Sequence, residues 1–320
     1  MSVWCRVLLP LVAGGPGLLA AAGVVSAHPD RVLIQGTGIY PESITSTSDG
    51  TLIIGSIGKG SVFRSKAGAA AEPWIAAGTQ GLLSVFGVLA DEKSKTLWVC
   101  SSEATNGSFL AAPGQASAAL MTFDLKSGAP RASFPFPGAQ KSLCNDIAVG
   151  RDGTAYATDT RNGRILRLKK GSADLDLWLQ NDMLQGGLDG IAFGDPSTLY
   201  VNTIGTGHLL RIALLADGSA GSITQIQTSR PLEHPDGMRP VAINQFLLIE
   251  GVGRVDLLTV TGDSAKVEPL KDGFVTPSGV TSVGGTAWVV EGKFAYRTDP
   301  KLKDQDPGPF YASAVAWPNR

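Results

Sequence analysis

The stretch CNDIAVGRDGTAYATDTRNGRILRL, residues 144–168, shows most completely the repeat from which the fold can be predicted. Its short apolar runs are separated by glycine-containing turns, which is the pattern of strands rather than of helices. Five other segments repeat the same order of an aliphatic start, a turn, an apolar run, a second turn and a further apolar run. These segments begin as PESI at Pro41, VFGV at Val85, LDGI at Leu188, PDGM at Pro235 and PSGV at Pro277.

The six repeats predict an all-β fold, a six-bladed β-propeller. Equivalent positions recur at intervals of 42 to 59 residues, and a unit of about 40–50 residues with several short strands is typical of one propeller blade. Arg31–Gln35 stands where the outer strand of a preceding blade would lie. We therefore expect this N-terminal strand to complete the last blade and close the ring, which leaves no long sheet edge exposed.

The composition agrees with a chain rich in turns and excludes other classes. The 320 residues include 40 glycines, 43% hydrophobic residues and 17% charged residues, with a formal net charge of −1. The chain is too apolar to be disordered, and it has no collagen-like glycine period. It also lacks the positive charge that holds a phosphate backbone, so we expect no nucleic-acid partner.

Residues 1–27 have the form of a cleaved signal peptide. Arg6 precedes an apolar run that ends in the small residues VSA at Ala27, where signal peptidase would cut. An uncleaved membrane anchor is the alternative, but prolines and a Gly-Gly pair interrupt the helix it would need. We predict that residues 28–320 form a single propeller domain. It would be exported, to the periplasm in a bacterium and otherwise by secretion, without stable membrane insertion.

Cys100 and Cys144 remain after this cleavage, because Cys5 leaves with the leader. An exported protein can join such a pair in a disulfide. Two buried free thiols are the other interpretation, and the spacing alone leaves both open.

The second residue of each repeat forms a column that should ring the central channel. Four of its members have oxygen donors, and they are Glu42, Asn145, Asp189 and Asp236. For any one repeat taken alone, a turn-forming residue is a simpler interpretation than a metal ligand. Four on one axis favour a metal, because clustered carboxylates need a compensating charge. Oxygen ligands indicate Ca²⁺, with Mg²⁺, Mn²⁺ or Zn²⁺ as alternatives.

A second column lies where the second strands end, at the same mouth. We interpret its members either as supports for the ligands or as turn caps. They are Ser56, Cys100, Asp159, Asn202, Glu250 and Glu291.

The motifs PESI, CNDI, LDGI and PDGM, in this order, resemble the SMP-30/gluconolactonase/LRE-like family, whose architecture the paraoxonases and diisopropyl-fluorophosphatase share. The resemblance covers residues 28–320 and implies a hydrolase of lactones, esters or organophosphates. It implies that Glu42, Asp189 and Asp236 bind a divalent metal in the channel and that Asn145 binds metal or substrate. The family usually has Asn where this chain has Asp189. Its sugar lactonases have Arg where this chain has Leu143, which favours a more hydrophobic lactone or ester.

The expected reaction is metal-dependent hydrolysis of a small lactone or ester. The ion would polarise the carbonyl group. By resemblance Asp236 is the first choice for general base or nucleophile, and Asp189 is the second. His234 could shuttle a proton, although an exposed loop histidine is the simpler interpretation.

Two connections between second and third strands are long, in blades 2 and 6. Long loops in compact folds are often functional, so we expect these to wall the pocket, with Phe109 and Phe294 as candidate substrate-lining residues. Variable surface loops are the alternative.

Two other functional classes fit the same fold. One is an exported propeller that binds a ligand without catalysis, since a fold does not determine a function. The other is a strictosidine-synthase-like condensation or another lyase or isomerase reaction. The acidic column favours the hydrolase, because neither a binding module nor that condensation needs converging metal ligands.

Overall fold

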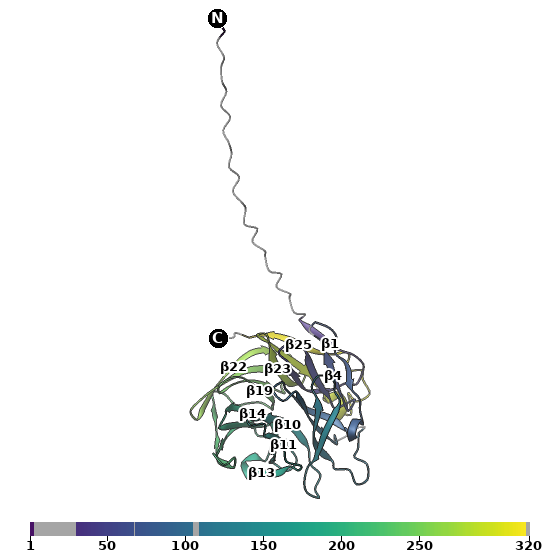
Figure 1. The fold of residues 1–320 in the computed structure, drawn as a ribbon, viewed down its shortest axis with the longest axis vertical. Coiled ribbons are helices and arrows are strands. Elements are labelled where there is room, and N and C mark those ends of the chain that lie inside the picture. Colours follow the sequence, from purple (N-terminus) through teal and green to yellow (C-terminus); the bar gives the residue numbers. More distant parts are fainter. Residues whose placement is uncertain (3–29, 67, 105–108, 318–320) are drawn as a thin grey trace.

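The strands of the computed structural model form six separate sheets, arranged around a common centre in Figure 1. The model describes residues 1–2, 30–66, 68–104 and 109–317. The expected all-β, six-bladed propeller is therefore confirmed. The predicted leader, apart from its first two residues, lies outside the described ranges. Within those ranges no helix is long and apolar enough to cross a membrane.

Each blade is an antiparallel meander whose first strand lies innermost. Blade 1 contains β2 (Pro41–Ser46), β3 (Leu52–Ser56), β4 (Ser61–Ser65) and β5 (Glu72–Ile75). Blade 2 contains β6 (Ser84–Asp91), β7 (Thr96–Ser102), β8 (Ala118–Asp124) and β9 (Pro130–Pro135). Blade 3 contains β10 (Cys144–Val149), β11 (Ala155–Asp159), β12 (Arg164–Leu168) and β13 (Asp176–Gln180). Blade 4 contains β14 (Leu188–Asp195), β15 (Thr198–Thr203), β16 (His208–Leu214) and β17 (Ala220–Gln225). Blade 5 contains β19 (Pro235–Ala242), β20 (Gln245–Glu250), β21 (Arg254–Thr261) and β22 (Ser264–Asp272), with β18 (Gln227–Thr228) beside β22.

Blade 6 joins the two ends of the chain. Its strands are β23 (Pro277–Val283), β24 (Thr286–Glu291), β25 (Phe310–Ala316) and β1 (Arg31–Ile34). Strand β1 pairs antiparallel with β25, from Arg31 opposite Ser313 to Ile34 opposite Phe310. Val32 and Ile34 point into the core beside Phe310 because side chains alternate along a strand. The expected closure by the N-terminal strand is confirmed. The short helices are η1 (Thr79–Gly81), η2 (Asp182–Leu184) and α1 (Ala295–Thr298).

Glycines let neighbouring inner strands approach one another at the channel. A Cβ atom on Gly190 would lie 2.7 Å from the carbonyl oxygen of Asp236, and one on Gly279 would lie 2.8 Å from that of Glu42. Such distances exclude any side chain. Gly87 and Gly237 make the same kind of contact. In four blades a glycine therefore directly follows the column residue, and its lack of a side chain lets the inner strand of the next blade come close.

Cys100 in β7 and Cys144 at the start of β10 form a disulfide, with their Cα atoms 5.1 Å apart. This decides between the two interpretations left open by the sequence. The bond ties blade 2 to blade 3 directly beside Asn145.

Replacing both cysteines with alanine should lower the free energy of unfolding by about 4 kcal/mol, because the bond closes a loop over a sequence separation of 44 residues. Urea unfolding measures the change. Dithiothreitol should cause a similar loss in the natural chain and none in the variant. Equal stability of the two chains would contradict the prediction.

Candidate functional site

The four column residues meet at the channel. Glu42, Asn145, Asp189 and Asp236 stand second in β2, β10, β14 and β19, and each is buried, with 5% to 9% of its surface exposed. The Asn145 Nδ2 atom donates a hydrogen bond to Asp189 Oδ2 over 3.0 Å. The negative charge of Asp189 acts on both Glu42 and Asp236. The structure thus brings together side chains that lie up to 194 positions apart in the printed sequence.

Burial and mutual repulsion raise the pKa values of these carboxyl groups. Burial first, and then the charges of Asp189 and Asp146, raises the pKa of Glu42 well above its ordinary value. Burial and then Asp189 and Glu42 do the same to the pKa of Asp236. Burial and Asp146 raise the pKa of Asp189 to about 7, against the opposing hydrogen bonds from Asn145 and Asp236. The cluster therefore carries more carboxylate than its own surroundings neutralise.

The donor set fits a hard divalent cation by its chemistry, since it is buried, built of oxygen donors and short of positive charge. These donors do not form a complete coordination shell in this arrangement. Among the residues that the structure describes, no three His, Cys, Asp or Glu side chains are spaced to hold a metal ion. Asp189 is engaged instead by hydrogen bonds with Asn145 and Asp236.

A buried arginine that the sequence reasoning missed crosses the channel. Arg239 in β19 of blade 5 donates from Nη1 and Nη2 to the two carboxylate oxygens of Asp146 in blade 3, over 2.7 Å and 3.0 Å. Its Nη2 also donates to Ser43 Oγ of blade 1 and to the Val88 carbonyl of blade 2, over 3.2 Å and 3.3 Å. One side chain thus links four blades beside the acidic cluster.

The signal for this link was a break in the glycine pattern. Asp146 and Ser43 occupy the position after the column residue, where the other four blades have glycine. Their side chains also accept hydrogen bonds from the inner strands of the next blades, at Ile191 and Val88. Arg239 lowers the pKa of Glu42 and Asp189. It is one positive charge among four carboxyl groups, so it offsets only part of the repulsion.

The turns that lead into the inner strands are strained. Tyr40, His234 and Thr276 have φ angles of 46°, 55° and 48°, in the left-handed region. Each directly precedes a proline that begins an inner strand. Non-glycine residues rarely adopt this conformation, and such strain concentrates at functional sites. Tyr40 and His234 stand two residues before Glu42 and Asp236, so two of these strained turns lead directly to the acidic cluster.

His234 is exposed, and its backbone carbonyl accepts a hydrogen bond from the Gly251 amide over 2.8 Å. The structure shows no contact of its imidazole with Asp236 among the described residues. Its role as a proton shuttle stays a prediction.

The two long connections run over residues 103–117 and 292–309, and residues 105–108 lie outside the described ranges. The Phe109 ring covers Gly60 in the turn after β3, where an added Cβ would lie 3.0 Å from the ring. Phe294 packs with Leu143 on the apolar cluster that also contains Phe86. Phe109 and Phe294 belong to the connections that follow β7 and β24, and these strands end at the mouth. Contact of the two rings with substrate stays a prediction.

The second column is offset in two blades. Strand register places Leu188 opposite Thr203 and Val85 opposite Ser101, so Asn202 and Cys100 stand one residue before the true column. A shift of one residue turns a strand side chain to the other face. Cys100 consequently reaches blade 3, and Asn202 Nδ2 donates to the Asp236 carbonyl over 2.8 Å.

Three acidic residues of the second column accept hydrogen bonds from the turns that precede the inner strands. Asp159, Glu250 and Glu291 accept hydrogen bonds from the backbone amides of Leu143, Glu233 and Val275, over 3.0 Å, 2.6 Å and 2.6 Å. They are therefore turn caps that also position the segments bearing the site.

Glu250 belongs to a buried acid pair that also contains Asp256. Arg230 bridges the two carboxylates, with contacts of 2.6 Å and 3.0 Å. Burial first, and then the hydrogen bond with Glu250, raises the pKa of Asp256 to about 7. A proton on Asp256 therefore stabilises the folded state.

This raised pKa predicts that the folded state loses stability as the pH rises. The folded protein keeps a proton on Asp256 that the unfolded chain releases near pH 4, so stability is full below that pH and falls towards pH 7. The loss between pH 5 and pH 8 should be about 2 kcal/mol. Asp256→Asn should remove this part of the pH dependence in urea unfolding, since the amide replaces the protonated acid. An unchanged slope in the variant would contradict the assignment.

No family model and no curated protein sequence matches the chain. Solved structures match along most of its length. A gluconolactonase from Xanthomonas campestris has 16% identity and a TM-score of 0.64, covering 91% of this chain and 99% of its own. A luciferin-regenerating enzyme has 11% identity and a TM-score of 0.65, covering 90% and 96%. Virginiamycin B lyase from Staphylococcus aureus has 15% identity and a TM-score of 0.58, covering 90% and 98%.

Fold and site together define a six-bladed β-propeller with a buried acidic cluster on its axis. The similar structures share this fold across different activities, so the fold alone leaves the activity of this chain open.

Proposed function

We propose that the chain is a divalent-metal-dependent hydrolase of a lactone or ester, of the gluconolactonase type. The observation that carries the proposal is the convergence of Glu42, Asp189 and Asp236 with Asn145 in a buried cluster whose carboxyl pKa values are raised. A bound cation would compensate this charge. The fold similarity to a gluconolactonase supports the reaction class.

Glu42, Asn145, Asp189 and Asp236 would hold the ion, with Ca²⁺ as the best match to oxygen ligands. The ion would supply Lewis acidity at the substrate carbonyl. Arg239 cannot replace it, because its guanidinium is already engaged by both oxygens of Asp146.

Asp236 is the residue best placed to move the proton. The Asn202 side chain donates a hydrogen bond to the backbone carbonyl of Asp236 and holds that residue in place. Burial raises the pKa of the Asp236 carboxyl group, and a raised pKa suits a general base. In this proposal Asp236 accepts a proton from water while the water oxygen bonds to the carbonyl carbon. The ester C–O bond then breaks, and the leaving oxygen takes the proton from Asp236.

The apolar residues of the mouth indicate the substrate class. Leu143 and Phe294 pack on one cluster with Phe86, and Phe109 covers the neighbouring turn. A lactone or ester with an apolar substituent matches this surface better than a free sugar lactone does.

The test is metal analysis of the purified mature protein together with a panel of lactones and esters, assayed with and without a chelator. We expect about one divalent ion per chain, and hydrolysis that the chelator abolishes and Ca²⁺ restores. The products should gain the mass of one water, which separates hydrolysis from a lyase reaction. A metal-free protein that turns over unchanged in the chelator would refute the proposal.

A further inference from the structure

A cavity of about 670 Å³ lies between blades 2 and 3, away from the acidic cluster. Its walls include Leu89 to Asp91, the last three residues of β6, and Val149 at the end of β10. The acidic cluster stands at the starts of the inner strands, and Asn145 is the second residue of β10, the strand that ends at Val149. Four residues of extended chain span about 13 Å, so the cavity opens towards the opposite face of the propeller.

The inner surface of this cavity is apolar. Leu89, Trp98, Phe134, Val149 and Leu168 line it, and all five belong to or pack on one apolar cluster. A surface of this kind gains free energy when an apolar body displaces water from it. Its volume suits a molecule of two or three rings.

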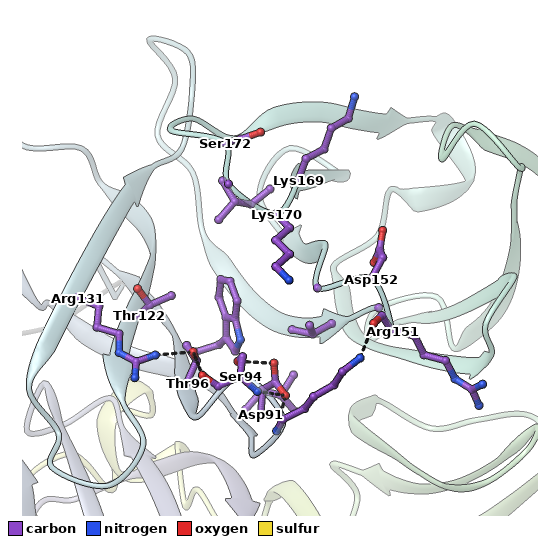
Figure 2. A pocket seen from close by; sticks show the side chains of 18 of the residues that line it. Asp91, Ser94, Thr96, Thr122, Arg131, Arg151, Asp152, Lys169, Lys170 and Ser172 are labelled. Atoms are coloured by element: carbon purple, nitrogen blue, oxygen red, sulfur yellow. Dashed lines mark hydrogen bonds between the residues drawn. The ribbon is translucent and has the colours of Figure 1, made fainter.

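The rim of the cavity is positively charged. Five cationic residues line it against two acidic ones, Asp91 and Asp152, and the five are Lys93, Arg131, Arg151, Lys169 and Lys170. Figure 2 shows the Lys170 side chain extending into the space between the blades, whereas Lys169 and Arg151 point away from it. Lys170 is therefore the cation that an anionic ligand in the cavity would meet.

Two of the other cations near the cavity have partners within the protein. Arg131 donates to Thr96 Oγ1 over 2.8 Å and pairs with Asp124 over 2.7 Å. The Lys93 ammonium donates to the backbone carbonyl of Arg151 over 2.8 Å and so spans the two blades. That carbonyl is neutral, so the positive charge of Lys93 remains at the wall and adds to that of Lys170.

We propose that this cavity binds a small organic anion with an apolar body, such as an aromatic sulfonate or carboxylate. The rings lie against Trp98 and Phe134, and the acidic group pairs with Lys170. The apolar wall and the positive charge of Lys170 then act on the same ligand. A neutral hydrophobic molecule lacks the charged contact, and an inorganic anion lacks the apolar one.

The experiment is a fluorescence titration with 8-anilinonaphthalene-1-sulfonate, compared with N-phenyl-1-naphthylamine, which has the same rings without the sulfonate. We expect one sulfonate site per chain. Lys170→Met should weaken sulfonate binding about tenfold and leave the neutral dye within twofold, because only the charged contact is lost. Lys169→Met is the matched control, with the same charge change on a side chain that points away.

Circular dichroism confirms that both variants fold. Equal effects of Lys169→Met and Lys170→Met, or no effect of either, would overturn the proposal. Asp236→Asn should bind the sulfonate as the natural chain does, and loss of binding in that variant would place the dye in the channel instead. Equal affinity of the two dyes for the natural chain would overturn the anionic part of the assignment.

Discussion

Asp236→Asn should lower kcat/KM for hydrolysis of the best lactone or ester by about 10³-fold or more. The amide keeps the shape of the side chain but can neither accept the proton from water nor give a cation its charge. Burial and the charges of Asp189 and Glu42 raise the pKa of Asp236. Its loss removes the proton acceptor and a proposed metal ligand together.

Asp256→Asn is the matched control, because it replaces another buried aspartate of blade 5 that stands in β21, away from the inner strand. We expect its turnover to stay within about twofold of the natural chain. Steady-state kinetics at saturating Ca²⁺, with metal content measured on the same samples, separates loss of the ion from loss of the base. Full activity of Asp236→Asn would refute the assignment of Asp236 and the mechanism built on it.

Arg239→Met should lower the free energy of unfolding by about 3–5 kcal/mol, measured by urea denaturation. The substitution leaves Asp146 buried, at 4% exposure, without the guanidinium that donates hydrogen bonds to both of its carboxylate oxygens. An uncompensated buried charge is among the most destabilising changes in a protein. Glu42 and Asp189 lose a neighbouring positive charge at the same time.

The double variant Arg239→Met, Asp146→Leu tests this reason. It removes both charges, so it should recover a large part of the stability that the single variant loses. A double variant no more stable than Arg239→Met would show that the cost comes from lost packing rather than from the stranded carboxylate.

The blade count, the closing strand and the channel column were all predictable, because each rests on a short pattern repeated along the chain. PESI, CNDI, LDGI and PDGM mark where inner strands begin, and a ring brings the starts of inner strands together.

The position of Asn202 was misjudged by one residue. Counting along a strand does not reveal a shift in pairing, and a shift of one reverses the face of the sheet.

The link from Arg239 to Asp146 joins residues 93 positions apart in different blades. Nothing in the periodicity of either strand specifies that partner, although the missing glycine at Asp146 indicated a special contact. The cavity beside Lys170 likewise depends on how far two neighbouring blades diverge, which local patterns do not encode.

The repeated pattern along the chain is enough to predict the six-bladed architecture and the acidic residues at its channel, because repetition and strand polarity act locally in each blade. Which side chains meet between blades follows only from the folded ring. These meetings are the Cys100–Cys144 bond, the arginine across the channel and the charged cavity on the far side. Each depends on the packing angle between sheets, a property of the closed ring and of no single repeat.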